Sequence, residues 1–131
     1  MYKPKLEKDI RCPLEYGLDI FGGKWNARIL CVLNSRGTIR YSQLRKDLYN
    51  ITDAVLSGAL KSLIANEMVE RIQYNEIPPR VEYKLSPKGE SAIPILQNIC
   101  RWSGVYQKEG EGDVVEFCRH CDYHGYGAAE A

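Results

Sequence analysis

Residues 52–74, TDAVLSGALKSLIANEMVERIQY, contain the change in hydrophobic period that decides the fold. In the first half of this stretch the apolar residues recur at helical spacing, which predicts a helix with one buried stripe: Leu56, Ala59, Leu60, Leu63 and Ile64. Thr52 is expected to cap its start, and Asn66 to end it in a left-handed turn. From Val69 onward apolar and polar residues alternate, which predicts a strand.

The flanking segments extend this pattern in both directions. The spacing of Trp25, Ile29, Val32 and Leu33 predicts one helix, and that of Tyr41, Leu44 and Leu48 predicts a shorter one with Thr38 or Ser42 near its start. Residues 81–85 alternate again, so residues 69–85 form a hairpin with Pro78 and Pro79 in its loop. Ser86-Pro87 then resembles a cap and first helical residue, opening a helix to about Gln107 that Pro94 should kink.

Three helices followed by a hairpin are the element order of a winged helix-turn-helix. The expected class is α+β, mostly α, with N-terminal and long C-terminal dimerisation helices around the winged unit. The apolar residues of the last helix, from Ala92 to Tyr106, cover more than one of its faces. Such a helix needs a second packing partner, and another subunit is the economical choice.

In such a fold the helix at residues 53–65 lies in the DNA major groove, and the hairpin reaches an adjacent groove or the backbone. Basic side chains would contact phosphates or guanine edges, and hydroxyls would add neutral hydrogen bonds. The candidate DNA contacts are Arg40, Tyr41, Ser42, Thr52, Asp53, Ser57, Lys61 and Arg80. The same pattern also occurs in protein-interaction modules, which is the alternative interpretation of these residues.

Several motifs in order resemble the HxlR family of winged-helix transcription regulators, related to MarR. They begin with Cys12-Pro13-Leu14-Glu15 and Gly22-Gly23-Lys24-Trp25, and the most specific piece is EIPPRVEYKLSPKG at residues 76–89. The resemblance covers about residues 12–106. It implies a homodimer that binds a pseudo-palindromic operator in double-stranded DNA, with one recognition helix per half-site. The chain departs from the family pattern on the recognition helix, where Asp53, Ala54 and Gly58 replace the usual polar or basic residues.

Cys12 precedes the first predicted helix and follows Arg11, with Lys8 nearby. Positive charge and a helix start both favour the reactive thiolate. In several members of the resembling family a cysteine at this position senses oxidants or electrophiles, which implies redox sensing through Cys12. The alternative is a half-buried small apolar residue. Cys31 is expected in the core, and Cys100 near the dimer seam.

Residues 109–131 form a second, acidic segment after the winged unit of residues 1–108, and they carry Cys118, Cys121 and His124. Cys-x2-Cys with a nearby His has the spacing of a zinc half-site, but a structural zinc ion needs a fourth ligand. The two thiols could instead form a redox pair, or be incidental. Zinc is therefore a possible cofactor here, and none is required elsewhere.

The composition of the 131 residues further narrows the functions and the cellular locations that we expect. The formal net charge is only +1, yet residues 24–108 carry +6 and residues 109–131 carry −5, so a DNA-binding body is compatible with the total. The longest apolar run, residues 29–33, is too short to cross a membrane, and no secretory signal is evident. We expect a cytoplasmic protein that is not an enzyme, since no nucleophile–base pair or phosphate loop is recognisable.

Overall fold

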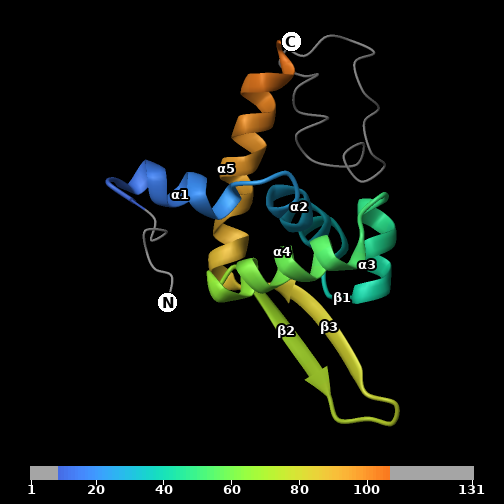
Figure 1. Cartoon of the computed structure of the whole chain (residues 1–131). Coiled ribbons are helices and arrows are strands. Elements are labelled where there is room, and N and C mark those ends of the chain that lie inside the picture. Colours follow the sequence, from blue (N-terminus) through green and yellow to red (C-terminus); the bar gives the residue numbers. More distant parts are fainter. Residues whose placement is uncertain (1–8, 107–131) are drawn as a thin grey trace.

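The computed structural model describes residues 9–106 and confirms the winged helix-turn-helix (Figure 1). The elements in chain order are α1 (Pro13–Phe21), α2 (Asn26–Arg36), β1 (Ile39–Arg40), α3 (Tyr41–Leu48), α4 (Asp53–Ala65), β2 (Val69–Tyr74), β3 (Arg80–Leu85) and α5 (Pro87–Gly104). The hairpin β2–β3, hereafter the wing, projects from one end of the helical body. Helix α5 extends toward the opposite end, and α1 projects to the side.

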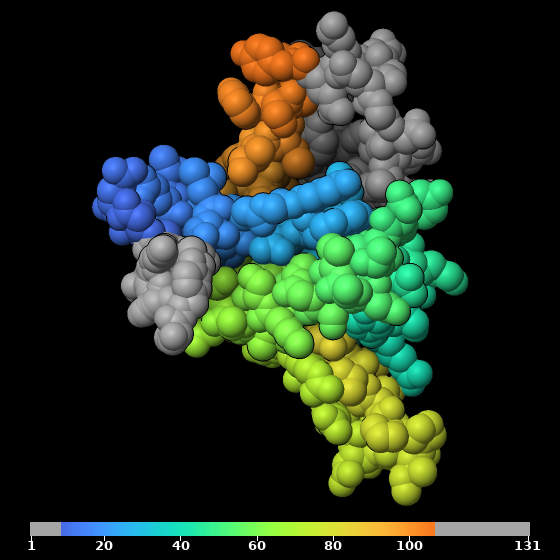
Figure 2. Space-filling model, viewed as in Figure 1, coloured from blue at the N-terminus to red at the C-terminus, as the bar shows by residue number. Residues whose placement is uncertain are grey.

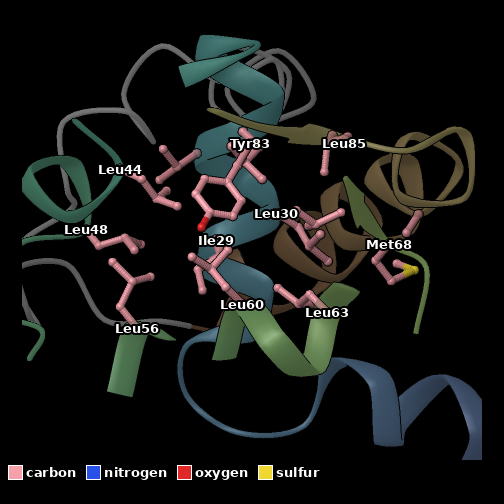
Figure 3. Packing of buried hydrophobic residues seen from close by; sticks show 14 of the residues in the cluster. Ile29, Leu30, Leu44, Leu48, Leu56, Leu60, Leu63, Met68, Tyr83 and Leu85 are labelled. Atoms are coloured by element: carbon pink, nitrogen blue, oxygen red, sulfur yellow. The ribbon is translucent and has the colours of Figure 1, made fainter. Parts of the chain in front are cut away.

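The core lies around α2, which contacts the other four helices and β3. Its side chains meet the buried stripe of α4 and the inner face of α3 (Figure 3). Seven large side chains are fully buried: Ile29, Leu30, Val32, Leu33, Leu44, Leu56 and Leu63. Cys31 is partly buried against this cluster, as predicted. Burial of these side chains fixes how α3 and α4 sit on the body.

The sheet has three antiparallel strands in the order β1-β3-β2. The predicted hairpin is confirmed, with Tyr74 opposite Arg80 at its far end and Val69 opposite Leu85 at its base. Strand β1 has no counterpart among the predicted elements. Its two residues are too few to show alternation, and it is defined only by its pairing with β3 through Ile39 and Tyr83.

The starts of α4 and α5 follow the predicted capping, whereas α3 begins after Arg40 without a side-chain cap and two helix ends differ from prediction. Thr52 Oγ1 accepts a hydrogen bond from Val55 N (3.2 Å), as an N-cap should. The expectation that Asn66 adopts the left-handed turn was wrong: its φ is −89°, and Glu67 takes that conformation with φ 59°. Helix α5 ends at Gly104 rather than near Gln107.

The start of α5 joins several segments of the body. Ser86 Oγ accepts from Gly89 N (2.9 Å) and donates to Glu67 O (2.6 Å). Lys88 Nζ donates both to Tyr16 Oη on α1 (2.7 Å) and to Asn66 O after α4 (2.9 Å). The first turn of α5 therefore fixes the end of α4 and also holds α1.

Candidate nucleic-acid interface

Helices α3 and α4 form the helix-turn-helix, joined by residues 49–52. Tyr49 and Asn50 have positive φ values of 59° and 53°, which reverses the chain within two residues. Leu48 and Leu56 are buried on either side of the turn, so packing sets the angle between the helices. Figure 2 shows α3, α4 and the wing on one continuous face of the molecule.

The exposed face of α4 carries the predicted contacts Asp53, Ser57 and Lys61, spaced four residues apart. Within residues 9–106 the side chains of Ser57 and Lys61 have no hydrogen-bond or ion-pair partner, and they are available to a ligand. Thr52 is also exposed, but its hydroxyl is already used as the cap. Helix α4 thus presents one acceptor, one hydroxyl and one cation along a single line.

The start of α4 is held against α3 by a three-residue cluster. Tyr41 Oη donates to Asp53 Oδ1 at 3.0 Å, and the guanidinium of Arg45 lies 3.4 Å from the same oxygen. Arg45 Nε also donates to Ile51 O (3.2 Å). Partial burial, together with the adjacent Asp53 carboxylate, raises the pKa of Tyr41 above its usual value of 10.0. Tyr41 is therefore a neutral hydrogen-bond donor at physiological pH.

An open groove of about 820 Å³ runs between α3 and α4 beside this cluster. It is lined by Tyr41, Ser42, Arg45, Lys46, Tyr49, Asn50, Ile51, Thr52 and Asp53. The structure therefore brings four predicted residues together here, while Arg40, Ser57, Lys61 and Arg80 lie outside the lining. Sequence reasoning missed Arg45 and Lys46. Arg45 could have been found, since it lies one helical turn after Tyr41 on α3.

Arg80 occupies the predicted end of the wing, but its charge is already balanced there. Its guanidinium stacks on the Tyr74 ring (3.8 Å) and pairs with Glu76 (3.0 Å) and Glu82 (3.6 Å). A hydrogen bond from Tyr74 to Glu82 raises the pKa of Tyr74. Arg80 thus stiffens the wing. Arg71 on β2 is exposed, and among the described residues its side chain bonds only to the neutral Gln73 (3.2 Å).

Cys12 lies at the N-cap of α1 and is exposed. The charge of Arg11, which the sequence suggested would favour a thiolate, is shared with Glu15 (3.3 Å) and Asp9 (3.8 Å).

Cys118, Cys121 and His124 fall outside the described residues. Within residues 9–106 no group of three His, Cys, Asp or Glu side chains is placed to hold a metal ion. In the same range no helix is both long and apolar enough to span a bilayer.

Comparisons with known proteins agree with this geometry. A sequence model described as HxlR-like helix-turn-helix matches residues 20–111. The uncharacterized HTH-type transcriptional regulator YkvN of Bacillus subtilis is 39% identical over 83% of this chain and 95% of its own length.

Two solved structures are similar throughout the winged unit. The reduced form of the transcriptional regulator YodB from B. subtilis is 30% identical, covers 77% of this chain and 99% of its own, and has a TM-score of 0.69. The redox regulator HypR in its oxidized form is 32% identical, covers 75% of this chain and 100% of its own, and has a TM-score of 0.67.

Proposed function

Because the chain belongs to the HxlR-like helix-turn-helix family of transcriptional regulators, we propose that it acts as a homodimer on a pseudo-palindromic operator. The observation that carries this proposal is the exposed line Asp53, Ser57 and Lys61 on α4, with the groove on one side and the wing beyond. Each α4 enters the major groove of one half-site, and Lys46 and Arg71 contact phosphates nearby. We expect it to act in the cytoplasm and to have no enzymatic activity.

A dimer is supported by apolar side chains on the two elements that project from the body. On α5 they recur at helical spacing and are exposed: Ile95, Ile99 and Trp102, with Tyr106 just after the helix ends. Trp102 is 69% exposed, and Leu14 on α1 is 67% exposed. An apolar stripe of this length is costly in water and is typical of an interface. A second copy would cover it and set the distance between the two α4 helices.

The dimer is tested by sedimentation equilibrium. Trp102→Glu places a charge in the stripe and should yield a monomer, whereas Trp102→Phe should remain dimeric at the same concentration. A Trp102→Glu protein that stays dimeric would place the interface elsewhere.

DNA binding is tested by the salt dependence of affinity for duplexes from the protein's own promoter region. Lys61→Ala should weaken binding and reduce the magnitude of the salt slope by about 1 for each protomer, because one phosphate contact is lost. Arg11→Gln removes a charge just before α1 and is the control, for which the slope should not change. Binding that is absent or independent of salt would favour the alternative, a protein-interaction module.

We also propose that oxidation of Cys12 regulates DNA binding. The thiol is exposed on α1, one of the two proposed dimer elements, and the similar structures include one named a redox regulator and a diamide-treated form of YodB. Diamide would take two electrons and two protons from Cys12 and a second thiol, forming a disulfide that alters the dimer. Cys12→Ser should then retain DNA in diamide while the wild type releases it. Equal release by both proteins would remove Cys12 from the mechanism.

The tail residues Cys118, Cys121 and His124 remain a candidate zinc site. Zinc analysis of purified full-length protein, with and without the double change Cys118→Ser and Cys121→Ser, tests it. A content near one zinc per chain that falls in the variant is expected if the site is real. Less than about 0.2 zinc per wild-type chain would exclude a tight site.

A further inference from the structure

Asp53 is the only acidic residue of α4, and it stands at the position where the helix would first meet DNA. A carboxylate there repels phosphates, so it weakens general affinity for DNA. Its side chain is 69% exposed, which excludes a role in the core. Its contacts with Tyr41 and Arg45 help to hold α4 against α3, and the exposed part of the carboxylate is available for a second role.

The carboxylate of Asp53 is oriented by one hydrogen bond and one ion pair, which both involve the same oxygen. Tyr41 Oη and the Arg45 guanidinium both contact Oδ1, at 3.0 and 3.4 Å. Among residues 9–106, no side chain or backbone group donates a hydrogen bond to Oδ2. Because the rotamer is already fixed by α3, a ligand that binds Oδ2 need not bear the entropy of ordering the side chain. The structure thus presents one pre-oriented, acceptor-only oxygen on the exposed face of α4.

An acceptor-only group discriminates between bases in the major groove. Cytosine presents the 4-amino donor there and carries no major-groove acceptor of its own, whereas guanine presents O6 and N7 acceptors and thymine presents O4. Adenine has an amino donor, but N7 lies next to it and would face the carboxylate. Asp53 should therefore favour cytosine and disfavour guanine most strongly.

We propose that Asp53 is a specificity-determining residue, and that its Oδ2 accepts a hydrogen bond from the 4-amino group of one cytosine in each operator half-site. Tyr41 and Arg45 are positioning residues that act through the carboxylate. This inference rests on the proposed binding of DNA by α4, and it names a base within that site.

Selection of duplexes from a random-sequence pool tests the inference, and the selected duplexes themselves define the operator. Wild-type dimer should enrich a symmetric site with cytosine at one position of each half-site. Asp53→Ala should lose the preference at that position, by about fivefold to tenfold, and keep the other positions. Asp53→Asn should shift the preference toward adenine, because an amide can both donate and accept. Glu90→Gln removes the same charge from α5 and should leave the selected site unchanged.

Tyr41→Phe tests the positioning step. It removes the hydrogen bond to Oδ1, so the cytosine preference at that position should weaken and the preferences at the other positions should be kept. Circular dichroism and thermal unfolding show whether each variant is folded. Enrichment of a site whose base preferences are the same for wild type, Asp53→Ala and Asp53→Asn would overturn the inference but leave DNA binding intact. Failure of wild type to enrich any duplex would instead overturn the proposed function, and the inference with it.

Discussion

Gly89, in the first turn of α5, offers a sharp test of how the winged unit is assembled. A Cβ on Gly89 would overlap the carbonyl oxygen of Met68 and would lie 3.1 Å from the carbonyl carbon and 3.2 Å from Leu85 Cδ2. The first two atoms are backbone, at the junction between α4 and β2, and cannot rotate away. Gly89→Ala should therefore push α5 off the base of the wing.

The loss of unfolding free energy in Gly89→Ala follows from the contacts around Gly89. Forcing a methyl group into a packed site costs about 1–3 kcal/mol. Displacing Met68 O breaks its hydrogen bond from Ser86 N (3.0 Å), worth about 1 kcal/mol, and disturbs the Ser86 cap on Gly89 N, worth about 1 kcal/mol more. Alanine gains about 1 kcal/mol in helix propensity. The net loss of unfolding free energy is about 2–4 kcal/mol.

Gly58→Ala is the matched control, because Gly58 also lies within a helix but a Cβ there meets no atom within 4 Å. This variant should gain up to about 1 kcal/mol from helix propensity alone. Thermal and urea unfolding should be compared at equal protein concentration, since the proposed dimerisation would contribute to apparent stability. At about 4 °C per kcal/mol, Gly89→Ala should lower Tm by about 8–16 °C. A Gly89→Ala protein as stable as Gly58→Ala would refute the close approach of α5 to Met68.

Three further outcomes are expected from the contacts described above. Ser86→Ala should lower the unfolding free energy by about 1–3 kcal/mol in urea, because Gly89 N loses its cap and Glu67 O loses its donor. Glu67→Gly should raise it by up to about 1 kcal/mol, since glycine adopts the positive φ of that residue without strain; no change would mean that the strain is relieved elsewhere. Because the pKa of Tyr41 is raised in the folded state, its contribution to stability is complete below pH 10 and is lost as the pH rises through the folded pKa. Tyr41→Phe should therefore lose less stability than wild type over that alkaline range, and ultraviolet absorbance should show one fewer phenol ionising above pH 10.

Sequence reasoning found the elements whose signals are local. The apolar stripe of α4, the caps at Thr52 and Ser86 and the alternation of the wing each depend on a few neighbouring residues, and each was confirmed. Strand β1 was missed because it exists only through pairing with β3, more than 40 positions away. The turn after α4 was predicted one residue early because Asn is the usual left-handed residue, while tertiary bonds impose that conformation on Glu67.

The candidate interface was predicted in outline but not in its internal contacts. Residues on the exposed face of α4 follow from helical periodicity, and the structure places them as expected. Helical periodicity does not predict which charged side chains pair with one another. Arg80 is balanced by Glu76 and Glu82 across the wing, and Asp53 is bound by Arg45 from another helix. Such pairings depend on side chains that only the folded chain brings together.

The Lys88 ammonium makes the position of α1 and the end of α4 parts of a single equilibrium. One cation divides its hydrogen bonds between Tyr16 Oη and Asn66 O, so a displacement of α1 changes the electrostatic environment at the carboxyl end of α4. By thermodynamic reciprocity, any free energy by which DNA binding at α4 favours one position of α1 equals the free energy by which that position of α1 favours DNA binding. The free energy of DNA binding and the free energy of subunit association would then be coupled through a single side chain.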